Sequence, residues 1–233
     1  MNSQLKEVRL QNALVSALVS WSSGKDSAWM LHRLRQSCEY EIVGLLTTLN
    51  TAFDRVAMHG VSRALLEGQA EAAGLPLWPV PLPWPCSNEH YEAAMAAACA
   101  RAVTEGIEVV AFGDLFLEDV RTYRESRLLG TGLRPVFPLW KEPTGPLLRE
   151  MLAGDVKACI VSLDLAQMPS HFIGRDLDLD LLAELPPHVD PCGENGEFHT
   201  FVYDGPFFRH PIAIERRGSV LRDGFLFADI VPA

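Results

Sequence analysis

A cluster of small polar residues with one cation stands where an apolar run ends. Residues 20–28 read SWSSGKDSA and continue the run ALVSALVS at residues 13–20. A loop between a strand and a helix directs backbone N–H groups and the helix dipole at an anion, while hydroxyls and a lysine add donors and charge. The sequence therefore predicts a phosphate-binding loop formed by Ser22, Ser23, Gly24, Lys25, Asp26 and Ser27.

This loop differs from the Walker A type of phosphate loop. Lys25 is followed by Asp26 instead of serine or threonine, and no glycine stands five positions before Gly24. An ordinary turn, in which Ser23 or Asp26 caps the following helix, is the alternative interpretation. Both interpretations place the start of a helix near Asp26.

The elements that position this loop follow from the alternation of apolar runs with amphipathic stretches, which is typical of βαβ units. We expect strands at 13–20, 41–48, 75–80, 107–113 and 135–140, and helices at 55–73, with Met58, Val61 and Leu65 on one face, and at 88–106. The predicted fold class is α/β, with a parallel five-stranded sheet and helices on both faces.

The pattern changes after residue 142. A helix at 146–155, a strand at 157–164, a segment rich in leucine and aspartate at 175–184, and glycine-rich, β-prone sequence follow. We therefore expect an α/β domain at 1–142, which carries the phosphate loop, and a smaller α+β domain at 143–233. Ligand clefts commonly form where two such domains meet.

Two further polar groups can share a site with the loop. Gly113 and Asp114 end the strand expected at 107–113, and ligands of open α/β sheets bind at the carboxyl ends of strands. Glu194 and Glu197 lie three apart, close enough to accept a proton or bind a cation together. The alternatives are a turn that begins at Asp114 and an exposed hairpin turn with solvated glutamates.

Composition limits the classes of partner and compartment. Thirty acidic and twenty basic residues give a formal charge of −10, and no Lys/Arg cluster offers a nucleic-acid surface. The five cysteines form no C-x-x-C pair, which favours reduced thiols in a cytoplasmic protein. The N-terminus lacks a signal-peptide pattern and no apolar run approaches ~20 residues, so we expect neither secretion nor membrane insertion.

The loop resembles the SGGKDS signature of the PP-loop ATP pyrophosphatases, with Ser23 where that family has a glycine. Residues 59–80, 111–140 and above all DPCGENGEFHTFVYDGPFF at 190–208 are similar to the diphthine-ammonia ligase family and its bacterial and archaeal relatives. The resemblance implies a Rossmann-like, adenine nucleotide alpha hydrolase-like fold. It also implies that ATP, bound with Mg²⁺, is cleaved between the α and β phosphates to leave an adenylated substrate.

The last motif departs from the eukaryotic pattern GEGGEYETF, because this chain has GENGEFHTF. Asn195 replaces a glycine and His199 replaces a glutamate, both where the acceptor substrate is expected. Asn195, His199, Gly196, Thr200 and Glu125 are therefore the predicted substrate contacts. The resemblance implies that the chemistry carries over, while the acceptor can differ.

The predicted catalytic residues are Lys25, Asp26, Arg121, Glu194 and Glu197. Lys25 and an arginine would neutralise charge that builds on the phosphoryl oxygens. Asp26 is the predicted Mg²⁺ ligand, since nucleotide-bound Mg²⁺ takes only one or two protein carboxylates. Arg121 and Glu125 lie four apart on one helix face, which the resemblance directs toward the nucleotide. A surface ion pair is the alternative for them.

The expected function is that of an ATP-dependent amide-forming ligase. Its partners would be ATP, ammonia or a small amine, and a carboxylate acceptor, which is protein-bound diphthine in the family's named reaction. A nucleotide-binding sensor without turnover is the first alternative. An RNA-thiolating PP-loop enzyme is the second, and the absence of a basic module and of paired cysteines argues against it. A homo-oligomer is compatible with the sequence.

Overall fold

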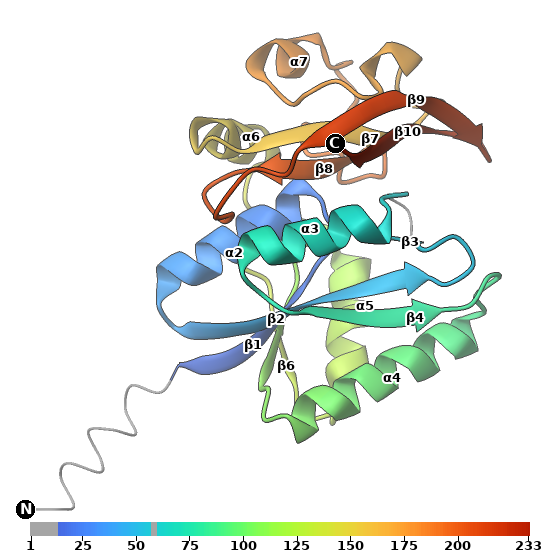
Figure 1. Cartoon of the computed structure of the whole chain (residues 1–233). Coiled ribbons are helices and arrows are strands. Elements are labelled where there is room, and N and C mark those ends of the chain that lie inside the picture. Colours follow the sequence, from blue (N-terminus) through green and yellow to red (C-terminus); the bar gives the residue numbers. More distant parts are fainter. Residues whose placement is uncertain (1–13, 57–59) are drawn as a thin grey trace, which may run out of the picture.

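The computed structural model describes residues 14–56 and 60–233, which form two sheets with helices between and around them (Figure 1). Met58 of the predicted helix lies outside the described residues. Residues 1–13, to which the expectation about a signal peptide refers, also lie outside the described residues. No helix in the described ranges is both long and apolar enough to cross a membrane.

The first sheet contains the five parallel strands that the sequence predicts. In spatial order they are β4 (Leu77–Leu82), β2 (Tyr40–Asn50), β1 (Val15–Ser20), β5 (Val109–Ala111) and β6 (Arg134–Val136). A short strand, β3 (Arg55–Val56), pairs antiparallel with the end of β2. The predicted α/β fold class is therefore confirmed.

Successive residues of the central strands enter the cores on opposite sides of this sheet. Val19 belongs to one hydrophobic cluster and Leu18 to the other, and Ala111 and Val110 are divided in the same way. Helices α2 (Lys25–Ser37) and α3 (Arg63–Ala73) cover one face, while α4 (Asn88–Thr104) and α5 (Glu118–Leu128) cover the other (Figure 1). Burial on both faces explains why these strands are continuously apolar in sequence.

The helix predicted at 55–73 is wrong at its start. Arg55 and Val56 extend the edge of the first sheet, and α3 begins only at Arg63. Gly60 has a φ of +66°, in the left-handed region that a right-handed helix does not use. The strands expected at 107–113 and 135–140 are also shorter, because β5 and β6 span three residues each.

The second sheet lies entirely in the C-terminal part and is antiparallel throughout. Its order is β8 (Phe198–Asp204), β7 (Lys157–Asp164), β10 (Phe225–Pro232) and β9 (Ile214–Arg222). The accompanying helical segments are α6 (Thr144–Ala153), η1 (Ser170–Phe172) and α7 (Leu179–Glu184). These elements confirm the α+β character expected after residue 142, whereas the domain boundary stays a prediction.

Helices α2 and α3 lie between the two sheets in Figure 1, and they join them into one core. A single hydrophobic cluster contains Val19 of β1, Leu31 of α2, Leu65 of α3 and Phe201 of β8. The first turn of α2 is thereby held beside β8, a strand of the second sheet.

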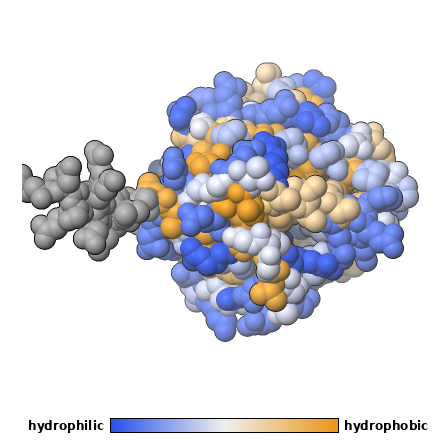
Figure 2. All heavy atoms as spheres, turned by 90° about the horizontal axis from the view of Figure 1, so that it is seen from below, coloured by the Kyte–Doolittle hydropathy of each residue, from blue (hydrophilic) through white to orange (hydrophobic). Residues whose placement is uncertain are grey.

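Seen from below, the face formed by α4 mixes hydrophobic and hydrophilic residues (Figure 2). Only Ala102 of α4 is buried, so this alanine-rich helix covers the sheet with a shallow contact. The deeper packing lies on the opposite face, where α2 carries seven buried residues.

Candidate active site

The candidate site lies where the sheet reverses its strand order. The chain leaves β1 for α2 on one face and leaves neighbouring β5 for α5 on the other, so a crevice opens between the two strand ends. A pocket of about 270 Å³ occupies this position. Its walls come from the loop after β1, the segment after β5, one face of α5, and residues 192–200.

The predicted phosphate loop forms the floor of this pocket. Gly24 is the N-terminal cap residue of α2, with a φ of −90° and a ψ of 173°, and no side chain caps the helix. The alternative in which Ser23 or Asp26 serves as the cap is therefore wrong. The first-turn N–H groups of a helix lack intrahelical acceptors, so this end of α2 can bind an anion.

Ser23 holds the loop from behind instead of lining the pocket. It is fully buried, and its φ of +73° lies in the left-handed region that favours glycine. Its carbonyl oxygen accepts hydrogen bonds from the backbone N–H of Val202 and from Gln69 Nε2, each at 3.0 Å. This conformation explains why the related signature has glycine at the position.

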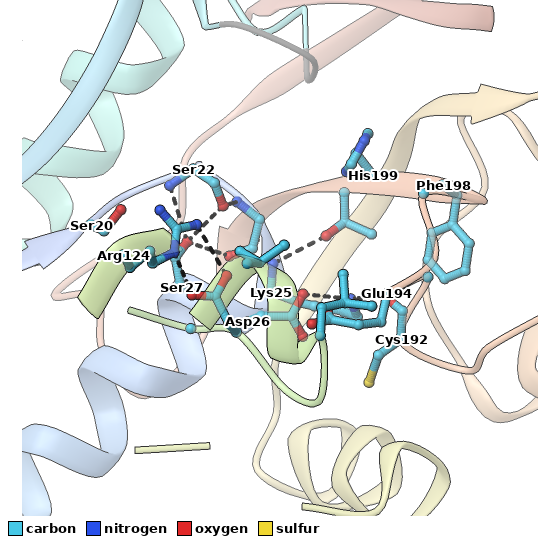
Figure 3. Close-up of a pocket in the computed structure, with 18 residues that line it drawn as sticks. Ser20, Ser22, Lys25, Asp26, Ser27, Arg124, Cys192, Glu194, Phe198 and His199 are labelled. Atoms are coloured by element: carbon cyan, nitrogen blue, oxygen red, sulfur yellow. Dashed lines mark hydrogen bonds and ion pairs between the residues drawn. The ribbon is translucent and has the colours of Figure 1, made fainter. Parts of the chain in front are cut away.

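Lys25 is a buried cation at the centre of the pocket (Figure 3). Its Nζ donates to Asp26 Oδ2 at 2.8 Å and to the carbonyl oxygen of Cys192, and it lies 5.5 Å from the centroid of the Phe198 ring. Burial lowers the pKa of Lys25, but the Asp26 carboxylate and other nearby negative groups outweigh burial and raise it. The lysine is therefore charged.

Asp26 has one carboxylate oxygen engaged and one available. Oδ2 accepts from Lys25, whereas Oδ1 is buried without a hydrogen-bond partner among the described residues. A buried carboxylate oxygen without a donor fits a hard cation such as Mg²⁺. Within residues 14–56 and 60–233, no group of three or more His, Cys, Asp or Glu side chains is arranged to hold a metal ion.

Several of the predicted site residues hold the phosphate loop in its conformation. Thr200 Oγ1 accepts the backbone N–H of Lys25 at 3.1 Å, which ties β8 to the start of α2. Ser22 and Ser27 place their Oγ atoms 3.2 Å apart across the loop. A Cβ on Gly113 would come within 3.2 Å of the backbone carbon of Asp26, so a larger residue here would have to displace the start of α2 by a few tenths of an ångström.

Residues 190–197 form a loop that two internal carboxylates organise. Glu197 is buried and accepts from the backbone N–H groups of Asp190 and Asn195 and from Asn195 Nδ2. Asp190 accepts from the N–H groups of Cys192 and Glu194. Neither Glu197 nor Asn195 lines the pocket, and the segment precedes β8 instead of forming an exposed β-hairpin turn.

Glu194 is the acidic residue that this loop presents to the pocket. Its Oε1 accepts the backbone N–H of Leu115 at 2.9 Å, which connects the loop to the segment after β5. Burial raises the pKa of Glu194 to about 7, in spite of the Leu115 hydrogen bond. The Glu194 side chain can therefore gain and lose a proton near neutral pH, which suits a general base.

His199 and Gly196, two of the predicted substrate contacts, also line the pocket. Burial and the charge of Lys25 lower the pKa of His199 to about 4, so its imidazole is neutral at pH 7. His199 therefore offers hydrogen bonds rather than charge to a ligand.

Helix α5 turns a different face to the pocket from the one predicted. Leu117, Val120 and Arg124 line it, whereas Arg121 and Glu125 do not. Arg121 Nε donates to Glu125 Oε1 at 2.8 Å, with both side chains about a third to a half exposed, and its guanidinium lies over the rings of Phe137 and Trp140. The surface-pair alternative describes Arg121 and Glu125.

The residue that sequence reasoning missed on this helix is Arg124. Its Nε and one terminal nitrogen donate to the two oxygens of Asp114, at 2.5 and 3.0 Å. Arg124 follows Leu117 and Val120 at helical spacing, so the sequence shows that these three residues share one side of the helix. It does not show that this side faces the pocket. Asp114 thus lies in the pocket as predicted, with both oxygens bound to Arg124.

The thiol of Cys192 has the environment of a structural cysteine. Its Sγ donates to the carbonyl oxygen of Thr144 at 3.5 Å, and burial raises the pKa of the thiol. A thiolate nucleophile requires the opposite shift.

Comparison with protein families gives two matches that together span most of the chain. Residues 15–135 match the model of the diphthamide synthase N-terminal domain, and residues 144–227 match that of the diphthamide synthase C-terminal domain. The first match alone covers the phosphate loop, Asp114 and Arg124. The second covers the loop that carries Glu194.

Individual proteins similar to this chain are named diphthine–ammonia ligase. The chain is 31% identical over 133 residues to the diphthine–ammonia ligase of Rattus norvegicus, which is 54% of this chain and 49% of the rat protein. It is 25% identical over 240 residues to that of Bos taurus, covering 93% of this chain and 88% of the bovine protein. The matched segment thus spans about half of the rat protein but most of the bovine one.

Proposed function

We propose, since the chain belongs to the diphthamide synthase family, that it is an ATP-dependent ligase that joins ammonia or a small amine to a carboxylate through an acyl-adenylate. A carboxylate oxygen of the acceptor bonds to the α-phosphorus of ATP, and the bond to the bridging oxygen of the β-phosphate breaks. Pyrophosphate leaves. The amine then bonds to the acyl carbon and AMP leaves.

One observation carries this proposal: a buried lysine and a helix N-terminus face the same pocket as a carboxyl group whose pKa is near neutral. Lys25 and the first turn of α2 bind the pyrophosphate end of ATP and neutralise its charge as it leaves. Glu194 lines the same pocket and accepts a proton from the ammonium ion, whose nitrogen can bond to the acyl carbon only after that proton has left.

Asp26 is the residue that would hold Mg²⁺, through its buried Oδ1. When bound, the ion supplies positive charge to the phosphate oxygens. The remaining loop residues act through their own groups. Ser22 adds a hydroxyl donor, Ser27 holds the loop by donating to the carbonyl oxygen of Gly24, and Thr200 fixes the backbone of Lys25.

Diphthine is the acceptor that the names of the relatives point to. The walls formed by Gly196, Phe198 and His199 would receive it, because they line the pocket from the C-terminal part of the chain, directly beside the phosphate loop. His199 is neutral there, so it selects an acceptor by hydrogen bonding and shape.

Product analysis with ATP labelled at the α-phosphate tests the proposal. Protein, Mg²⁺, ammonium and diphthine-bearing elongation factor should give AMP and pyrophosphate in equal amounts, with the amide visible by mass spectrometry. Lys25→Ala should lower AMP formation about a hundredfold or more. Lys157→Ala removes an exposed lysine at the start of β7 and should leave it unchanged.

Three other outcomes separate the alternatives. Formation of ADP and phosphate would reject adenylation while retaining the phosphate loop. AMP formed only with a fractionated cell extract, and not with diphthine-bearing factor, would reject this acceptor alone. Stoichiometric ATP binding with no turnover under any condition would reject the ligase and favour the nucleotide sensor.

A further inference from the structure

Arg124 is the second cation of the pocket, and no motif of the resemblance assigns it a role. Lys25 and Arg124 are the two permanently charged basic side chains among the lining residues, which also include Asp26, Asp114 and Glu194. His199 adds no charge at neutral pH, because its pKa is about 4. Arg124 therefore doubles the positive charge that Lys25 alone would set against these carboxyl groups and offer to a polyphosphate.

The guanidinium of Arg124 is fixed in position before any ligand binds. Asp114 accepts two parallel N–H bonds from it, and the Asp114 side chain is only 14% exposed. The Cζ atom of Arg124 also lies over the Phe112 ring, 4.5 Å from the ring centroid. A bidentate bond to Asp114 and an adjacent aromatic ring leave few orientations for the guanidinium.

Three N–H bonds of the guanidinium remain after Asp114 has taken two of the five. The chain offers them no other hydrogen-bond partner among the described residues, and Arg124 lines the pocket. In Figure 3 Arg124 lies on the side of Ser20 and Ser22, at the end of β1, whereas Glu194 and Phe198 lie on the opposite side. Lys25 stands between these two sides.

From this arrangement we infer that Arg124 is the phosphate-contacting residue that neutralises the α-phosphate of the nucleotide, and that Asp114 is its positioning residue. The inference rests on the proposed adenylation. As the acceptor oxygen bonds to the α-phosphorus and the bond to the pyrophosphate oxygen breaks, negative charge grows on the non-bridging α-oxygens. Preorganised N–H donors at this place stabilise the transition state more than the ground state.

The same arrangement gives Asp114 and Asp26 different roles. Both oxygens of Asp114 are occupied by Arg124, while Oδ1 of Asp26 has no partner among the described residues. Asp114 therefore orients a cationic side chain, and Asp26 is the carboxylate available to a metal ion.

Binding measurements test the contact without any turnover. Arg124→Ala should weaken AMP binding about tenfold or more while leaving adenosine binding unchanged, because only AMP carries the α-phosphate. Arg127→Ala, on the same helix but paired with Glu92 at the surface, is the matched control and should change neither affinity. Equal affinity of wild type and Arg124→Ala for AMP would overturn the inference, whatever reaction the protein catalyses.

Kinetic measurements test the transition-state role. Arg124→Ala should lower kcat for AMP formation by roughly 10²–10³-fold, and added guanidinium ion should restore part of it, which a folding defect would not allow. Arg124→Lys should change the discrimination between ATP and its α-thio analogue but not its β-thio analogue. A thio effect that stays at the wild-type value in Arg124→Lys would overturn the assignment to the α-phosphate.

Asp114→Asn tests the positioning role separately. The amide keeps the size of the side chain but loses the charge and one acceptor, so the guanidinium gains freedom. We expect kcat to fall more than AMP affinity, and the guanidinium ion to give no rescue, since the arginine is still present. A variant with wild-type kcat would show that Asp114 does not position Arg124. If the wild type forms no AMP at all, the proposed function fails, while the AMP and adenosine affinities still decide the role of Arg124.

Discussion

Gln69 is a polar side chain in the core, and its replacement should loosen the phosphate loop. It is fully buried on α3. Its Oε1 accepts from Trp21 Nε1 at 2.8 Å, and its Nε2 donates to the carbonyl oxygens of Ser23 and Val202, at 3.0 and 2.6 Å. One amide thus joins Trp21, the residue that follows β1, to the phosphate loop and to β8.

The expected cost follows from the groups left behind. Gln69→Ala leaves the indole N–H of Trp21 buried without an acceptor, which costs about 1–3 kcal/mol, and adds a void where the side chain packed. The free energy of unfolding should fall by roughly 2–4 kcal/mol. For a chain of this size each kcal/mol lowers Tm by about 2–4 °C, so the shift is easily measured.

Gln69→Glu separates hydrogen bonding from packing. The carboxylate has the same size and still accepts from Trp21, but it turns an oxygen toward the carbonyls of Ser23 and Val202. Urea denaturation should show a loss of stability at least as large as that of Gln69→Ala, and ATP binding should weaken. Glu67→Ala, at an exposed position of the same helix, is the control. A loss below about 0.5 kcal/mol for Gln69→Glu would refute the hydrogen-bond argument.

Three further outcomes are expected. Ser23→Gly should raise the free energy of unfolding by about 1 kcal/mol in urea denaturation, because the φ of +73° costs a non-glycine residue energy. Amide formation should increase with pH through about 7 as Glu194 becomes a carboxylate, and this inflection should vanish in Glu194→Gln but persist in His199→Ala. Cys192→Ala should keep AMP formation within a few-fold of wild type, because its buried thiol is not a nucleophile; complete loss in a folded variant would contradict this.

Local patterns predicted the parts of the site whose geometry is itself local. The loop after β1 needs only a strand, a turn and a helix in succession, and residues 20–28 specify all three. The five apolar runs likewise predicted the strands, since burial on both faces leaves a continuous signal. Gln69 was detectable in principle, because it occupies a buried position between Leu66 and Ala70 of an otherwise apolar face.

The orientation of side chains was less accessible from sequence. On α5, Arg121 and Arg124 are three positions apart, or about 60° around the helix axis. A small rotation therefore decides which of them faces the pocket, and the helix carries too few apolar residues to fix that rotation from sequence. Glu194 and Glu197 lie in a loop, where buried and exposed positions do not alternate at a regular spacing. Their different roles depend on which backbone N–H groups each carboxylate meets, and these are set by the folded loop.

The phosphate loop depends on the second sheet for its conformation. The left-handed backbone of Ser23 costs about 1–2 kcal/mol and persists only where surrounding contacts over-determine it. Those contacts come from Gln69 and from the N–H of Val202 in β8, while Thr200 of the same strand holds the N–H of Lys25. A ligand that shifts β8 therefore moves the backbone that carries Lys25. The wall expected to receive the acceptor and the loop expected to bind ATP are thus parts of one hydrogen-bonded unit. We therefore expect an acceptor that displaces β8 to change the affinity for ATP, which ATP titrations with and without acceptor would measure.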